Sequence, residues 1–273
     1  MGWRVGSVPY VNAAPLVWGL ADRGIEVVYD LPSRLPALLE AGAVDAILVS
    51  SIYGLVNPDL RMVGSVGIAS YGPVTSVKVF SRLPLKDIQT LALDSSSMTS
   101  NRLAIEILHS RGATPTTVSM APDLDTMLAS YDACVLIGDI GMSSHSAAVR
   151  EYDLGEEWKE LTGLPFLWAG WVGSSSLSDE LADLLVDAGV AAGCGVGLAQ
   201  DPTLEIAREG VIKLASETSG LPEAVVRTYL TETMSFQLTD SVKRGYQEYA
   251  RRIKAPHFPI WIGATDIHAV TAG

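Results

Sequence analysis

One turn of this chain, at residues 95–100, is rich in hydroxyl side chains. After the apolar run at residues 91–93, five of the six positions from Ser95 to Ser100 carry a hydroxyl group, and apolar residues then follow at helical spacing. The first N–H groups of a helix lack partners within the helix and carry partial positive charge. Hydroxyl donors at that point suit a carboxylate or a phosphate. Helix capping is the alternative, but a cap needs only one hydroxyl, so the turn predicts an anion site.

Further neutral polar groups follow other apolar runs. Ser50 and Ser51 form a second hydroxyl pair where an expected strand meets a helix start. Asn12 stands between Pro9 and Pro15, whose rings fix φ and stiffen both flanks of the turn. We therefore expect its amide to be held in place. Turn formation alone is the alternative role for this asparagine.

Asp139 follows the apolar run at residues 134–137, which predicts a strand. Its carboxylate would then stand at the carboxyl end of that strand, where acid–base residues of α/β enzymes often lie. Aspartate is equally suited to cap the helix that follows. The sequence leaves both proton transfer and helix capping open for this residue.

Motifs for cofactors and metals are missing from the sequence. No GxGxxG motif follows a strand and no Walker loop occurs, which excludes a dinucleotide or nucleoside triphosphate site of those types. The histidines are isolated from cysteines and carboxylates at metal-ligand spacing. They are His109, His145, His257 and His268. We expect neither a cofactor nor a metal.

Alternating strands and helices must position these polar groups. Strands are expected at residues 5–8, 25–29 and 46–49, with helices opened by Pro15 and at residues 35–41. This alternation predicts an α/β fold with parallel strands. Ligands of such sheets gather at the carboxyl ends of the strands, and the polar turns follow those ends.

A second, self-contained α/β set occupies residues 85–150. A long strand at 74–80 is expected to cross between the two sets, and a strand at 166–172 to return, after which only helices follow. These helices begin near Ser178, Pro202, Pro222 and Thr239. The predicted boundaries are residues 1–78 and 172–273 for domain I and 79–171 for domain II. Two crossings between two halves predict a bilobed molecule with a central hinged cleft.

Charge and composition restrict the partners. With 19 basic and 31 acidic residues the net charge is −12, which disfavours nucleic acid and anionic membranes. The most apolar stretch, residues 181–199, contains two aspartates and predicts a packed helix rather than a membrane span. Cys134 and Cys194 are expected to be reduced and buried. No secretory leader precedes the first strand, so we expect a cytoplasmic protein; the oligomeric state is left open.

Several short segments carry a family resemblance. They are Ser7–Leu16, Val49–Ser51, Gly72–Val74 with Ser76–Val77, Leu93–Ser100, Ile137–Asp139, Asp153–Gly155 and Thr162–Phe166. In these segments the chain resembles the menaquinone-biosynthesis family of the futalosine route, and most closely its chorismate dehydratases. The carboxyl-terminal helices carry no matching motif. A related branch of the family cleaves a cyclic futalosine product with a histidine base, which has no strong counterpart here.

The resemblance implies a two-domain fold like the type II periplasmic binding proteins, and chorismate as the small-molecule substrate. The implied reaction removes water to give 3-[(1-carboxyvinyl)oxy]benzoate. Because loss of the 4-hydroxyl makes the ring aromatic, this reaction needs no cofactor. The two substrate carboxylates would be bound by hydroxyls on opposite walls of the cleft: Ser97, Thr99 and Ser100 on one, and Ser50, Ser51 and Ser76 on the other.

Two residues are candidates for catalysis under this resemblance. Asn12 would orient the ring or the leaving hydroxyl, and Asp139 is the side-chain candidate for proton transfer. The substrate's own enolpyruvyl carboxylate is the alternative base, in which case the protein supplies orientation and electrostatics.

Other functions fit the same fold, because fold does not decide function. A non-catalytic binding protein for a small carboxylate is the main alternative, and the absence of a leader counts against it. A ligand-sensing module of a regulator is a second, but neither a helix-turn-helix segment nor a basic face is present to meet DNA. The cyclic futalosine-processing lyase branch is a third.

Overall fold

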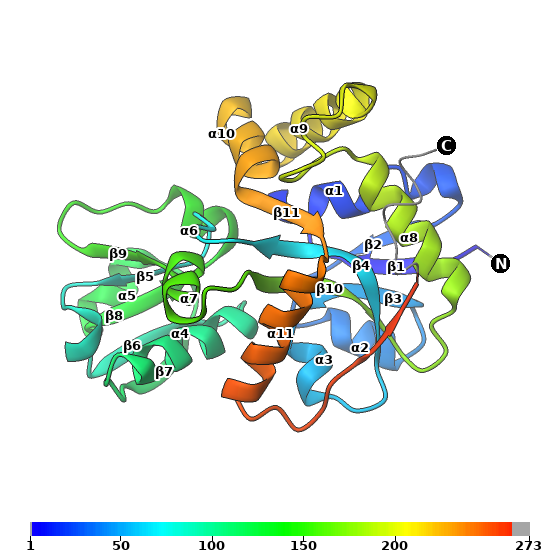
Figure 1. The fold of residues 1–273 in the computed structure, drawn as a ribbon. Coiled ribbons are helices and arrows are strands. Elements are labelled where there is room, and N and C mark those ends of the chain that lie inside the picture. The colour runs from blue at the N-terminus through cyan, green and yellow to red at the C-terminus, as the bar shows by residue number, and fades with distance from the viewer. Residues whose placement is uncertain (1, 264–273) are drawn as a thin grey trace.

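The computed structural model describes residues 2–263, which form two α/β units joined by two crossings of the chain (Figure 1). The larger unit contains a seven-stranded sheet, in the order β11-β4-β10-β3-β1-β2 with β12 beside β4. Its strands are β1 (Arg4–Ser7), β2 (Glu26–Tyr29), β3 (Ala46–Ser50), β4 (Arg61–Ser70), β10 (Phe166–Gly173), β11 (Met234–Gln237) and β12 (Ile260–Ile262).

The smaller unit contains a five-stranded sheet in the order β7-β6-β8-β5-β9. Its strands are β5 (Lys78–Ser81), β6 (Thr90–Asp94), β7 (Thr116–Met120), β8 (Ala133–Leu136) and β9 (Arg150–Asp153). In this sheet β6 is parallel to β7 and β8, and in the larger sheet β1 is parallel to β2 and β3. The prediction of an α/β fold with parallel strands is confirmed.

Helices cover both sheets, and their starts follow the caps seen in the sequence. The side chains of Asp123, Ser178 and Thr239 each accept a hydrogen bond from a backbone N–H of the helix that follows. The helices of the larger unit are α1 (Ala14–Val17), α2 (Leu35–Glu40), α3 (Ile52–Val56), α8 (Asp179–Ala191), α9 (Glu205–Ser219), α10 (Glu223–Thr228) and α11 (Asp240–Arg252). Those of the smaller unit are α4 (Thr99–Ser110), α5 (Leu124–Ser130), α6 (Gly138–Ser143) and α7 (Leu154–Thr162).

Aromatic side chains fill the junction between the units. Phe166, at the start of β10, packs against Trp168 at a ring-centroid distance of 4.4 Å, against Tyr249 at 5.0 Å and against Trp158 at 5.2 Å. Trp158 belongs to α7 and Tyr249 to α11, so the cluster joins helices of both units to the returning strand. Buried aromatic rings contribute large apolar areas, and this junction is therefore well packed.

The prediction of a long strand at residues 74–80 is wrong. Only Lys78–Ser81 forms a strand, β5, and the preceding loop is held by a carboxylate instead of a neighbouring strand. The backbone N–H groups of Val74 and Thr75 donate to Asp153, with the shortest N–O distance 2.7 Å. Thr75 also has φ of +60°, which breaks the extended backbone that a strand needs. The long crossing strand is β4, which runs beside β10 between the units (Figure 1).

The expectation that only helices follow residue 172 is also wrong, because β11 and β12 both pair with β4. In β11 the buried Met234 and Phe236 alternate with half-buried polar residues, a strand pattern that spans only four positions. β10 pairs with β3 and β4 from Phe166 onward, so the returning strand lies in the larger sheet, while the domain boundaries themselves stay a prediction.

The apolar stretch at residues 181–199 contains most of α8, a helix of 13 residues, and does not form one long helix. Within residues 2–263, every helix is too short or too polar to cross a bilayer.

Candidate functional site

A cavity lies between the two units, at the carboxyl ends of two parallel strands from each sheet. Val8 follows β1, Ser50 ends β3, Ser96 follows β6, and Ile137 follows β8; all four line the cavity. The empty volume between its walls is about 670 Å³, open solvent included. Small-molecule sites in α/β proteins occupy this position.

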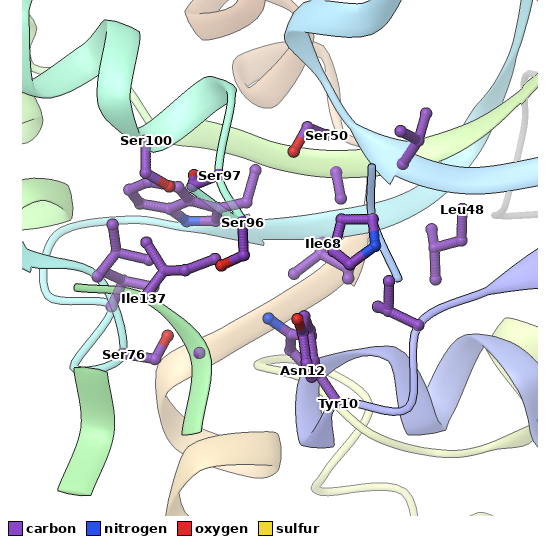
Figure 2. A pocket seen from close by; sticks show the side chains of 18 of the residues that line it. Tyr10, Asn12, Leu48, Ser50, Ile68, Ser76, Ser96, Ser97, Ser100 and Ile137 are labelled. Carbon is purple, nitrogen blue, oxygen red and sulfur yellow. The ribbon is translucent and has the colours of Figure 1, made fainter. Parts of the chain in front are cut away.

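The polar groups of the cavity wall are uncharged. They are the side chains of Tyr10, Asn12, Ser50, Ser76, Ser96, Ser97 and Ser100. Figure 2 shows Ser50, Ser97 and Ser100 on one side of the cavity, with Asn12 and Ser76 on the opposite side. No lining residue within the described part of the chain is a lysine, arginine, histidine or carboxylate. An anion here would be held by neutral donors and by the backbone.

The hydroxyl-rich turn does not cap its helix with a side chain. Helix α4 begins at Thr99, and its N-cap residue, Met98, makes no side-chain hydrogen bond. The Ser96 hydroxyl instead donates to Asp94 Oδ1 at 2.5 Å. Ser97 and Ser100 therefore remain at the cavity wall beside the free N–H groups of the first helical turn.

Asn101 fixes the shape of this turn. Its Nδ2 donates to the carbonyl oxygens of Asp94 and Ser97, at 2.8 and 2.5 Å. Asn101 was not predicted from the sequence. An asparagine in the first turn of a helix often bonds back to the preceding loop, and that signal could have identified it.

Two of the predicted substrate-binding residues, Ser51 and Thr99, do not line the cavity. The Ser51 hydroxyl donates to the carbonyl of Leu167 at 2.7 Å, and the N–H of Ile52 donates to Thr99 Oγ1 at 3.0 Å. The two hydroxyl oxygens lie 3.5 Å apart. Both side chains are buried. Because Ser51 directly precedes α3 and Thr99 begins α4, this contact joins a helix of the larger unit to a helix of the smaller unit. We name this contact the hinge end of the cavity.

The other predicted binding residues, Ser50, Ser76, Ser97 and Ser100, all lie at the cavity wall. The Ser76 hydroxyl is 2.8 Å from the hydroxyl of Tyr229, and Tyr229 also makes a side-chain hydrogen bond with Asn12. Tyr229 was missed from the sequence, because the carboxyl-terminal segment carries no motif. We name the contacts around Asn12 and Ser76 the latch end of the cavity.

Asp139 lies at the latch end, but its carboxylate does not line the cavity. It accepts a hydrogen bond from the backbone N–H of Val11, next to Asn12, and burial raises its pKa. It does not cap α6 either, because the N-cap position is Ile137 and carries no side-chain bond. Asp139 thus links the smaller unit to the turn that presents Asn12.

Asp153 holds the loop that carries Ser76. Its carboxylate accepts the N–H groups of Val74 and Thr75 and also those of Gly155 and Glu156 at the start of α7. One side chain therefore caps a helix and fixes a strained loop with φ of +60° at Thr75. Asp153 lies within one of the segments that carry the family resemblance, but no role was predicted for it.

Trp168 and Tyr10 supply the flat parts of the wall. The Trp168 indole N–H donates to the hydroxyl of Ser70 at 3.0 Å, which fixes the ring plane. Burial, followed by the negative charges of Asp94 and Asp139, raises the pKa of the Tyr10 phenol. Neither aromatic was singled out from the sequence.

The histidines lie away from the cavity. His145 is exposed and bonds Glu151 at 2.6 Å; neither it, His109 nor His257 lines the cavity, and His268 lies outside the described residues. Within residues 2–263, no three His, Cys, Asp or Glu side chains gather in a metal-binding group. Both cysteines are buried, and burial raises their pKa to about 12.

Sequence comparison identifies relatives. Residues 3–255 match the family described as menaquinone biosynthesis. A chorismate dehydratase of Thermus thermophilus is 31% identical over 185 residues, which cover 61% of this chain and 68% of that protein.

Structural comparison identifies the fold. A protein of Archaeoglobus fulgidus superposes with a TM-score of 0.70 at 18% identity, covering 92% of this chain and 96% of that one. The periplasmic aliphatic sulphonate binding protein of Escherichia coli gives 0.62 at 15% identity, covering 97% and 94%. A Candida albicans protein described as having the generic periplasmic binding protein fold gives 0.58 at 10% identity, covering 98% and 99%. The expected periplasmic-binding-protein-like fold is confirmed.

Proposed function

Because the chain belongs to the menaquinone-biosynthesis family, we propose that it is a chorismate dehydratase, a carbon–oxygen lyase that converts chorismate to 3-[(1-carboxyvinyl)oxy]benzoate and water. The relative in Thermus thermophilus carries that activity in its name. The observation that supports the proposal best is the cavity itself. Its two walls carry separate sets of uncharged donors, which suits a substrate with two carboxylates.

The two carboxylates bind at different walls in this proposal. Ser97 and Ser100, with the free N–H groups at the start of α4, take one carboxylate, and Ser76 on the opposite side is near the other. Ser50, which was expected beside Ser76, lies on the same side as Ser97 and Ser100. Ser51 and Thr99, which were expected to bind directly, support these walls from behind through their hydrogen bonds at the hinge end. Oriented neutral donors in a dry site stabilise an anion without cationic side chains.

The reaction breaks the C3–H and C4–O bonds of the ring and forms the C3–C4 double bond. The ring carboxylate acidifies the C3 hydrogen through the diene, so donors on that carboxylate stabilise the dienolate that develops. The 4-hydroxyl then leaves with a proton as water. Aromatisation of the ring drives this step, and Asn12 is positioned at the cavity wall to orient the ring or the leaving hydroxyl.

We assign the base to the enolpyruvyl carboxylate of the substrate. The described residues that line the cavity include no carboxylate or imidazole, and Asp139, which accepts the N–H of Val11, is not among them. The protein then contributes by holding the substrate carboxylate close to the C3 hydrogen, an effect of proximity and orientation. Asp139 as the base is the alternative, tested below by Asp139→Asn.

The test is conversion of chorismate by the purified protein, with no added cofactor and with chelator present. We expect a product lighter than chorismate by one water, with an aromatic ultraviolet spectrum. A reaction without protein accounts for spontaneous rearrangement of chorismate, which keeps its mass. Chorismate that binds and survives would instead support a binding protein, and cleavage of a cyclic futalosine nucleoside would move the chain to the other branch of the family.

A further inference from the structure

Tyr229 connects the carboxyl-terminal part of the chain to the cavity. It is the first residue of a π-helical turn, Tyr229–Thr233, that joins α10 to β11, and it is 3% exposed. Its hydroxyl lies 2.8 Å from Ser76 Oγ and also bonds the side chain of Asn12. One phenol therefore contacts two polar residues of the cavity wall that are far apart in the sequence.

The phenol stays neutral at physiological pH. Burial is the main cause that raises its pKa, to about 12. A neutral phenol has one hydrogen to donate and lone pairs to accept. All three groups are satisfied when the Asn12 amide N–H donates to the phenol oxygen and the phenol O–H donates to Ser76 Oγ. The Asn12 carbonyl oxygen and the Ser76 hydroxyl hydrogen then remain for a ligand in the cavity.

The backbone conformation at Tyr229 favours a functional role for this residue. π-helical turns are rare and are frequently found at functional sites. The next strand, β11, also brings Met234 to the cavity wall, so this turn delivers two neighbouring side chains to the site. The ring of Tyr229 is packed within the main hydrophobic core, which fixes the position of its hydroxyl.

We propose that Tyr229 is a positioning residue for the dehydration: it sets the orientation of the Asn12 amide and the Ser76 hydroxyl toward the substrate without contacting the substrate itself. This inference rests on the proposed function. A purely structural role would require only that the buried phenol find a partner. A positioning role requires in addition that turnover depend on the phenol through Asn12 and Ser76.

Tyr229→Phe tests the role, because it keeps the ring and removes only the hydroxyl. We expect kcat with chorismate to fall about tenfold or more with KM changed about threefold at most, the pattern for an interaction that counts mainly in the transition state. Tyr53→Phe is the matched control. It removes another buried tyrosine hydroxyl, which bonds Glu40 at 3.5 Å away from the cavity, and should leave kcat unchanged.

A mutant cycle separates positioning from general damage. In a protein that already carries Asn12→Ala and Ser76→Ala, adding Tyr229→Phe should lower kcat by less than about twofold, since residues that act through one another are not additive. Unchanged kcat in Tyr229→Phe would overturn the role. So would an equal loss in the Asn12→Ala, Ser76→Ala background, or an equal loss in Tyr53→Phe. A wild-type protein that leaves chorismate intact would refute the proposed function instead, and this role with it.

Discussion

The hinge end and the latch end of the cavity use the same kinds of side chain for different purposes. At the hinge end, the buried Ser51 hydroxyl donates to Leu167 of its own unit, and the buried Thr99 hydroxyl accepts the N–H of Ile52 from the opposite unit. At the latch end, the backbone N–H of Val11 donates to Asp139 of the smaller unit, and the neighbouring Asn12 is half-buried at the cavity wall. Adjacent hydroxyls of one turn are thus divided between holding the units together and facing a ligand.

The helix phase explains the division within the turn. Successive residues of a helix point about 100° apart, so Thr99 turns toward α3 while Ser100 faces the cavity. Tyr249 reinforces the hinge end by donating to the Thr99 carbonyl at 3.2 Å.

The largest effect is expected from Ser97→Ala combined with Ser100→Ala. Each hydrogen bond lost to a charged group costs about 1.5–3 kcal/mol, so the Kd should rise by about 100-fold or more. Calorimetry with the product, which keeps both carboxylates and is not consumed, measures this change. Ser95→Ala, on the exposed side of the same turn, is the control. Wild-type affinity in the double variant would place the ligand elsewhere.

Thr99→Val should show the opposite pattern. It leaves the N–H of Ile52 buried without its acceptor, which lowers the free energy of unfolding by about 1–3 kcal/mol. The KM for chorismate should change little, because this side chain does not line the cavity. Denaturant unfolding measures the loss, and Thr99→Ser should restore stability. A Thr99→Val variant with normal stability and weak chorismate binding would show that Thr99 serves the ligand. It would contradict the separate roles of the hinge end and the latch end.

The smallest effect is expected from Asp139→Asn, because the asparagine carbonyl still accepts the N–H of Val11. Burial raises the folded-state pKa of Asp139. The protonated Asp139 therefore stabilises the folded protein fully below its unfolded-state pKa of about 3.9. This stabilisation is lost as pH rises through the folded-state pKa. The variant, which carries no charge there, should gain stability over wild type as pH rises, measured as Tm from pH 4 to 7. Turnover should stay near normal; a loss of 100-fold or more would return Asp139 to the role of base.

Much of the fold could be predicted from the sequence. Apolar runs marked β1, β3, β6 and β8, and single polar residues such as Ser178 and Thr239 marked helix starts. β11 was missed because four alternating residues directly after a helix carry little signal, and its pairing with β4 is far away in the sequence. Thr75 could not be predicted, because its positive φ depends on the distant Asp153.

The sequence predicted which turns form the candidate site, but not what each side chain does there. Ser50, Ser76, Ser97, Ser100 and Asn12 all reach the cavity wall. Ser51 and Thr99 were grouped with them, because the facing of adjacent hydroxyls depends on the first residue of each helix, which sequence patterns fix only within a residue or two. Tyr229 was out of reach, since its partner Ser76 is 153 positions away.

The uncharged lining of the cavity has a consequence for how fast a dianion arrives. A protein with a net charge of −12 repels such a molecule at long range, and no cationic side chain on the described wall draws it inward. Encounter is therefore slowed at low ionic strength, whereas at about 0.15 M the repulsion is screened beyond about 8 Å. Salt should speed association here, the reverse of its effect on sites built from lysine and arginine.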